Sequence, residues 1–153
     1  MKLENHIWNM LIGQFTHELD SKKRLTLPSK WRASLGKKVV VTNGLDTSLF
    51  VFGIKEWERI AERLASQSIG NPDSRGFNRF LLAHAFETDI DGQGRILIPD
   101  TLKSFAKLDG KVILAGMHSR IEIWDEKVWK RYTEKTMKEA DTLAGKLSDL
   151  GIL

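Results

Sequence analysis

Cysteine is absent from this chain of 153 residues, which also has only three prolines and one tyrosine. Without a thiol the chain forms neither disulfides nor thiolate metal sites, and a reducing compartment is compatible with it. No apolar run is long enough to cross a bilayer, and Met1–Met10 lacks the basic start and cleavage site of a signal peptide. We therefore expect a cytoplasmic protein with no membrane span and no signal peptide.

The signatures of common enzyme classes are missing as well. The four histidines include no pair at the spacing of three or four residues that metal ligands on a helix require. Ser21, Ser29 and Ser119 do not lie in a nucleophile elbow, and no glycine-rich phosphate loop precedes a helix. We therefore expect a protein that is not an enzyme, has no cofactor and takes no small-molecule substrate.

What the chain does contain is a duplication. Residues 15–28 (FTHELDSKKRLTLP) align with residues 86–99 (FETDIDGQGRILIP) at a constant offset of 71. One inserted residue later the match resumes at an offset of 72, which pairs Trp57 with Trp129. Such a repeat predicts a pseudo-symmetric protein.

Each copy has the pattern strand, turn, strand, short helix, two strands and helix. In the first copy Leu25–Leu27 alternates apolar and polar residues, Pro28 is expected to open a helix, and Gly36 is expected to close it. Val39–Thr42 and Leu49–Phe52 are rich in β-branched and aromatic residues, as strands are. The second copy repeats this order.

Four segments are expected along the chain. They are, in order, a basic first repeat (13–60), a linker helix region (61–84), a second repeat (85–129) and a C-terminal helix or tail (130–153). In the linker, Phe77, Phe80 and Leu81 recur at helical spacing, so this helix is expected to bind the two repeats together. Short strands and one-sided helices cannot bury themselves singly, so we expect the repeats to share one core.

Charge distinguishes the two copies. The whole chain carries a net charge of +4, which suggests an anionic partner only weakly. Residues 15–57 carry eight basic and four acidic side chains, whereas residues 86–129 carry six basic and eight acidic ones. If one repeat meets a polyanion, we expect it to be the first.

The second copy has a glycine-containing turn, Asp91-Gly92-Gln93-Gly94-Arg95, between two predicted strands. Glycine can take the positive φ that a tight hairpin needs. This segment therefore predicts a local two-stranded hairpin with Arg95 where its second strand begins.

The first copy has Lys23 where the second has Gly94, so we expect a lysine at positive φ, at a strain of roughly 1 kcal/mol. Lys22, Lys23 and Arg24 then form a compact cationic tip with no acid nearer than Asp20. Asp20 is expected to accept hydrogen bonds from the turn or to orient Arg24.

These residue types suit DNA. An arginine can bond guanine O6 and N7 together, a two-stranded ribbon fits the major groove, and lysine suits phosphate. The candidate DNA-contacting residues are Lys22, Lys23, Arg24, Lys30, Gln93 and Arg95, and the candidate turn-structuring residues are Asp20, Asp91, Gly92 and Gly94. A basic turn that is merely solvated is the alternative.

A calcium site is another alternative. Residues 89–100 place oxygen-bearing side chains at loop positions 1, 3, 5 and 12 and glycine at position 6, as in an EF-hand loop with flanking helical stretches. The first copy has Lys22 at position 5. A hairpin therefore explains both copies, whereas a metal explains one.

The duplicated pattern Asp-x-x-Gly-Arg, followed by an apolar strand and proline, resembles the MraZ family of bacterial transcriptional regulators with two SpoVT-AbrB-type repeats. The resemblance runs from about Met10 to Tyr132, and its most specific motif is Gln93–Pro99. It implies an α+β fold of tandem swapped hairpins with a pseudo-dimeric β-barrel core and flanking helices. The family's DNA-contacting arginine falls on Arg24, with Arg95 as its counterpart, and Lys23 departs from the family's glycine.

The resemblance also implies a function and partners. It implies a homo-oligomeric ring that binds double-stranded DNA at short direct repeats in its own promoter region, acting as a repressor of the division and cell-wall gene cluster and associating with the nucleoid. Several identical tips at fixed spacing would raise avidity by about 10² to 10⁴. Related swapped-hairpin proteins bind toxins, so a toxin partner stays open, whereas the single tyrosine argues against single-stranded RNA.

Overall fold

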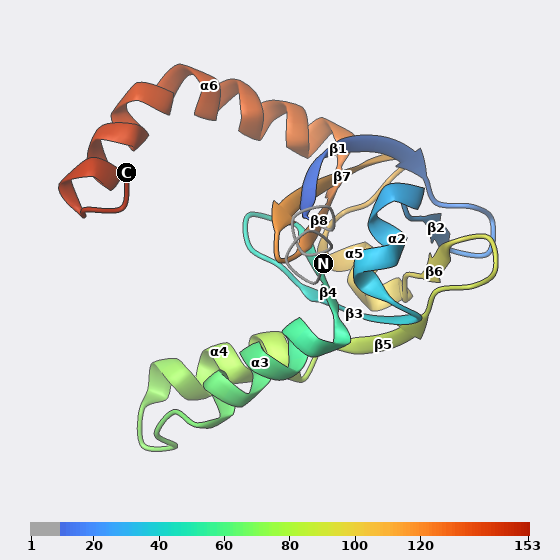
Figure 1. Cartoon of the computed structure of the whole chain (residues 1–153), viewed down its shortest axis with the longest axis horizontal. Helices are drawn as coiled ribbons and strands as arrows, with labels where there is room; N and C mark the ends of the chain where they lie inside the picture. Colours follow the sequence, from blue (N-terminus) through green and yellow to red (C-terminus); the bar gives the residue numbers. More distant parts are fainter. Residues whose placement is uncertain (1–9) are drawn as a thin grey trace, which may run out of the picture.

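A computed structural model describes residues 10–153 (Figure 1). The segment Met1–Asn9, on which the expectation of no signal peptide depends, lies outside the described residues. Within residues 10–153, no helix is both long and apolar enough to cross a membrane.

The order of elements predicted from the duplication is confirmed. The first repeat contains β1 (Leu11–Glu18), β2 (Arg24–Thr26), α2 (Ser29–Leu35), β3 (Lys38–Asn43), β4 (Leu49–Gly53) and α3 (Ile54–Ala65). After α4 (Pro72–Leu82), the second contains β5 (Phe86–Asp89), β6 (Arg95–Leu97), α5 (Asp100–Phe105), β7 (Lys111–His118), β8 (Ile121–Asp125) and α6 (Glu126–Asp149). The short helices begin one residue after Pro28 and Pro99, because each proline is the N-cap rather than the first helical residue.

The two repeats exchange strands. Six strands form an antiparallel sheet in the order β1-β7-β8-β4-β3-β5, while β2 and β6 form a separate two-stranded ribbon. The strands on either side of each turn do not pair with each other, because β1 pairs with β7 and β5 pairs with β3. The local hairpin predicted at each turn is therefore wrong, and the pairing follows the swapped arrangement that the resemblance implied.

The β-barrel core that the resemblance implied does not appear as a closed barrel among the strand pairings of residues 10–153. Strands β1 and β5 are the two outermost strands of the sheet order. The strands that follow them, β2 and β6, pair with each other and not with these edges. The fold is therefore an open sheet with a ribbon laid over one face.

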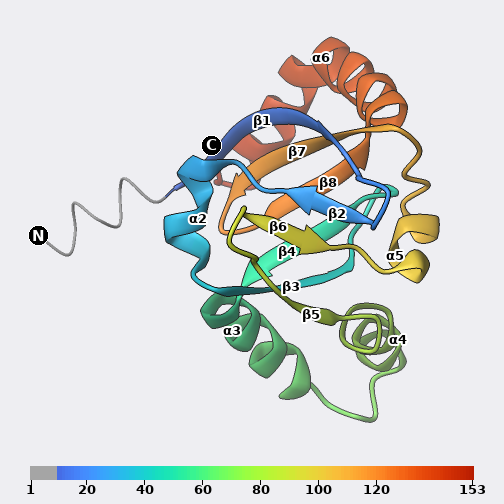
Figure 2. The ribbon, with the colours of Figure 1, turned by 90° about the vertical axis from the view of Figure 1, so that its right-hand side faces the viewer.

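The main core lies between the sheet and the layer that contains the ribbon, α2 and α5 (Figure 2). Leu25 and Ile96 at the centre of the ribbon are almost fully buried, as are Trp31 of α2 and Leu102 of α5. Successive strand residues point to opposite faces, so the neighbours of these two ribbon residues point away from the core. The outward-facing residues are Arg24, Thr26, Arg95 and Leu97.

The opposite face of the sheet carries the longer helices. Phe50 and Phe52 pack against Leu81 of α4 and Trp57 of α3. Phe80 of α4 also contacts a ring of the second repeat, so the linker helix joins both repeats as predicted. Helix α6 contacts the sheet near its start and then extends beyond the body of the protein (Figure 1).

Candidate nucleic-acid interface

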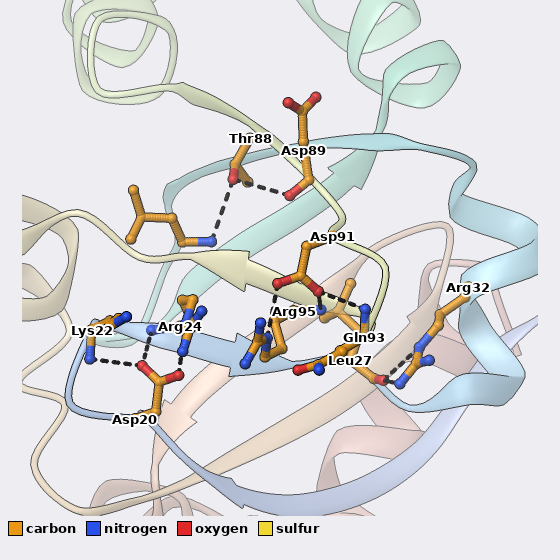
Figure 3. A network of polar contacts seen from close by, with 11 residues as sticks. Asp20, Lys22, Arg24, Leu27, Arg32, Thr88, Asp89, Asp91, Gln93 and Arg95 are labelled. Carbon is orange, nitrogen blue, oxygen red and sulfur yellow. Dashed lines mark hydrogen bonds and ion pairs between the residues drawn. The ribbon is translucent and has the colours of Figure 1, made fainter.

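The first turn is organised by Asp20. One carboxylate oxygen, Oδ1, accepts the backbone N–H groups of Lys22 at 2.8 Å and Arg24 at 2.9 Å. The other, Oδ2, accepts the side-chain Nε–H of Arg24 at 2.8 Å (Figure 3). Asp20 therefore closes the turn and also orients the arginine.

The second turn has the same contacts despite its different sequence. Asp91 Oδ1 accepts the backbone N–H groups of Gln93 and Arg95, each at 2.9 Å, and Oδ2 accepts Arg95 Nε–H at 2.8 Å. Lys23 has a φ of 62° and Gly94 a φ of 79°, so the predicted lysine at positive φ is confirmed. The duplication has thus conserved the turn geometry and the orientation of one arginine in each copy.

Both aspartates are held in the ionised form. The backbone N–H of Arg24 is the largest cause that lowers the pKa of Asp20 below its ordinary value, and the Arg24 side chain adds to it. The backbone N–H of Arg95 lowers the pKa of Asp91 in the same way. At neutral pH each carboxylate is therefore charged and keeps its arginine in place.

The two arginines lie on one surface. In the ribbon, Arg24 is opposite Leu97 and Arg95 is opposite Thr26, so the arginines are diagonal neighbours on the outward face. Diagonal neighbours in an antiparallel pair are about 7–8 Å apart. The exchange of strands therefore replaces two separate tips with a single ribbon face that carries both arginines.

Each guanidinium has one edge committed and one edge open. The hydrogen bonds of Arg24 and Arg95 to their aspartates use Nε, and within residues 10–153 neither terminal pair of nitrogens has a hydrogen bond. The side chains are 31% and 25% exposed, respectively. This geometry leaves Nη1 and Nη2 for a two-bond contact with a guanine edge or a phosphate.

Lys23 differs from the sequence expectation. Its Nζ lies 2.5 Å from Oδ2 of Asp100, so the expectation that Asp20 is the nearest acid to the cationic tip is wrong. Asp100 begins α5 of the second repeat, and the ribbon brings it to the first turn. The two side chains are 44% and 68% exposed, so the pair contributes at most about 1 kcal/mol to stability.

Arg32 was missed by sequence analysis. This residue of α2 donates from Nε at 3.1 Å and from Nη2 at 2.9 Å to the carbonyl oxygen of Leu27 (Figure 3). Its Cζ lies 2.0 Å from the position that a Cβ on Gly94 would occupy. One feature of the sequence points to this contact. The second copy has Gly94 where the first has Lys23, so the second turn has space for a side chain from elsewhere.

The remaining candidates occupy different positions. Lys22 and Gln93 are equivalent exposed residues of the two turns. Gly92 does not have a positive φ and has room for a Cβ, so Gly94 is the glycine that the turn requires. Lys30 projects from α2 with its Nζ 5.3 Å from the centre of the Phe15 ring, which places it beside β1.

The acids of the EF-hand-like loop do not converge. Asp91 bonds Arg95, Asp100 bonds Lys23, and Asp89 lies 3.9 Å from the ammonium of Lys38. The segments on either side of the turn are the strands β5 and β6 rather than helices, and each pairs with a strand of the first repeat. In the described part of the chain no cluster of three or more His, Cys, Asp or Glu could hold a metal ion, so the geometry gives the calcium alternative no support.

Comparison with known proteins identifies relatives for both repeats. The family model described as "MraZ protein, putative antitoxin-like" matches residues 10–80 and again residues 81–147. A protein of Thermoanaerobacter sp. (strain X514) named "Transcriptional regulator MraZ" is 44% identical over 143 residues, which cover 94% of this chain and all of the relative. Proteins of the same name from Caldanaerobacter subterraneus subsp. tengcongensis and Acetivibrio thermocellus are 43% and 39% identical over the same coverage.

Proposed function

Because the chain belongs to the MraZ family, whose curated relatives are named transcriptional regulators, we propose that it regulates transcription by binding double-stranded DNA through the outward face of the β2–β6 ribbon. The observation that carries this proposal is the pair Arg24 and Arg95, placed diagonally on that face with their guanidinium groups already oriented. Orientation before binding reduces the entropy that association costs.

The shape and chemistry of the ribbon support contact with the major groove. A two-stranded antiparallel ribbon fits that groove, and arginine is the side chain that most often recognises guanine there. Lys22, Lys23 and Gln93 flank the two arginines and suit contacts with phosphates or base edges. In this proposal Asp20 and Asp91 shape the turns and do not touch the DNA.

Assembly would increase the affinity of a small ribbon. We propose a homo-oligomeric ring whose ribbons bind short direct repeats in the promoter region of the division and cell-wall gene cluster, repressing it at the nucleoid. Leu143 and Leu147 on the projecting half of α6 and Leu150 at its C-cap recur at helical spacing and are exposed, which supports packing between copies. Linked binding events then gain about 10² to 10⁴ in avidity.

Fluorescence anisotropy tests the proposal directly. The protein is titrated into a duplex that carries the direct repeats upstream of its own gene cluster and into a scrambled duplex, at several salt concentrations. We expect tight binding to the repeats that weakens as salt rises, because bound phosphates release counterions. Arg59→Ala is the control variant, since Arg59 lies on α3 on the other face of the sheet and pairs with Glu56. Equal, weak binding to both duplexes would refute specific DNA recognition.

A further inference from the structure

The two turns carry different cations at equivalent positions. The first turn has Lys22, Lys23 and Arg24, whereas the second has Gln93, Gly94 and Arg95. From the sequence, the second turn has therefore lost two positive charges while keeping its arginine. A DNA surface built from both turns would then be strongly basic at one end only.

Arg32 supplies a positive charge at the second turn, because its guanidinium fills the space beside Gly94. A Cβ on Gly94 would lie 2.0 Å from Cζ, 2.2 Å from Nε and 2.4 Å from Nη2 of Arg32. No side chain fits at residue 94 while the guanidinium of Arg32 stays where it is. A charge carried by α2 of the first repeat thus occupies the place of the side chain that the second turn lacks.

The charge of Arg32 is held in place without being neutralised. Two of its nitrogens donate to the carbonyl oxygen of Leu27, which fixes the plane of the guanidinium. Among the ion pairs formed within residues 10–153, none includes Arg32, whereas Lys23 at the equivalent end of the ribbon is paired with Asp100. A fixed cation without a counter-ion is suited to binding an anion.

We propose that Arg32 is a DNA-contacting residue, which binds a backbone phosphate beside the base edge contacted by Arg95; this rests on the proposed function. The edge formed by Nη1 and Nη2 is the part of the guanidinium that can face a phosphate, since the edge with Nε is committed to Leu27. Phosphate contacts fix the register of a protein on DNA. Arg32 would therefore set the position of the second turn in the groove.

The salt dependence of binding separates this role from a structural one. Each phosphate contact contributes about 0.9 to the slope of log K against log salt concentration on duplex DNA. We expect Arg32→Gln to reduce that slope by about 0.9 and to weaken binding roughly tenfold at moderate salt. Arg59→Gln, which removes a charge from the opposite face of the sheet, is expected to leave the slope unchanged.

A rescue variant tests the placement of the charge. The Arg32→Gln substitution opens the space over Gly94, so Gly94→Lys can be added to it. The new lysine would stand at the position equivalent to Lys23, and Lys23 itself has a positive φ in the first turn. We expect this double variant to recover the slope of the wild type. Arg32→Lys keeps the charge and is expected to keep most of the slope even where the melting temperature falls.

The outcomes are distinguishable. A wild type that shows no salt-dependent binding to the repeats would overturn the proposed function. A wild type that binds, with an Arg32→Gln variant of unchanged slope, would overturn the role of Arg32 and leave the proposed function standing. A lower melting temperature with an unchanged slope would assign Arg32 to the stability of the turn alone.

Discussion

Asp20 holds Arg24 at two points, since one carboxylate oxygen accepts the backbone N–H of the arginine and the other accepts its side-chain Nε–H. The same carboxylate therefore fixes both where the turn ends and where the guanidinium points. A short acidic side chain four residues before the arginine suffices for this, and both copies have one.

Replacing Asp20 tests this preorganisation. We expect Asp20→Ala to weaken binding to the direct repeats about tenfold, because the freed guanidinium must lose rotational freedom when it binds. Asp20→Asn keeps an acceptor for the backbone N–H groups and is expected to weaken binding less. Anisotropy titrations on the same duplex measure both variants. Wild-type affinity in Asp20→Ala would show that the orientation of Arg24 is irrelevant to recognition.

The two arginines are expected to contribute unequally. Arg24→Ala should abolish discrimination between the direct repeats and a scrambled duplex. We expect affinity for the direct repeats to fall roughly 10- to 100-fold, because the loss of base contacts costs this much. Arg95→Ala should weaken binding less, since the basic residues of the first repeat remain. Competition titrations with the scrambled duplex compare the variants. Equal losses would refute the asymmetry.

Gly94 and Gly92 form a matched pair of sites in one turn. Gly94→Ala combines a positive φ with a collision against Arg32, so we expect it to lower the free energy of unfolding by about 1–3 kcal/mol. Gly92→Ala has open space and no positive φ, and is expected to change it by less than about 0.5 kcal/mol. Chemical denaturation measures both values. Similar effects of the two substitutions would contradict the contact between Gly94 and Arg32.

Removing the charge of Asp100 is expected to affect binding more than folding. Asp100→Asn frees Lys23 for phosphate and removes a negative charge close to the turn, so affinity for the scrambled duplex should rise several-fold at low salt. Stability should change by less than about 1 kcal/mol, because the pair is exposed. Unchanged non-specific binding would mean that Lys23 does not meet the DNA backbone.

The lowered pKa values of Asp20 and Asp91 predict a pH dependence of stability. A carboxyl group whose pKa is lower in the folded than in the unfolded state contributes stability above its unfolded pKa, near about 4, and loses it as pH falls through the folded pKa. The free energy of unfolding should therefore fall in this acidic range. Replacing both residues by asparagine should make the fall shallower, which thermal melts between neutral and acidic pH measure. An unchanged acid profile would mean that these hydrogen bonds add nothing to stability.

Local features of the fold could be predicted from the sequence, whereas contacts between the repeats could not. The order of strands and helices, the role of Asp20 and the positive φ of Lys23 all depend on residues within a few positions of one another. The pairing of Lys23 with Asp100 spans 77 residues, and the duplication alone does not say which strand of one copy meets which strand of the other. Arg32 stayed hidden for the same reason, since its contact with Gly94 exists only after β2 and β6 pair.

The exchange of strands has a consequence for how the two copies diverged. β1 pairs with β7 and β3 pairs with β5, so each repeat completes the sheet of the other, as two chains would in a dimer. In a dimer of identical chains every substitution appears twice, and both ends of the ribbon must stay alike. Fusion into one polypeptide removes that constraint, so one end can carry Lys23 and the other Gly94 with Arg32. The resulting ribbon has a polarity, and a ribbon with a polarity can distinguish a DNA site from the same site read in reverse.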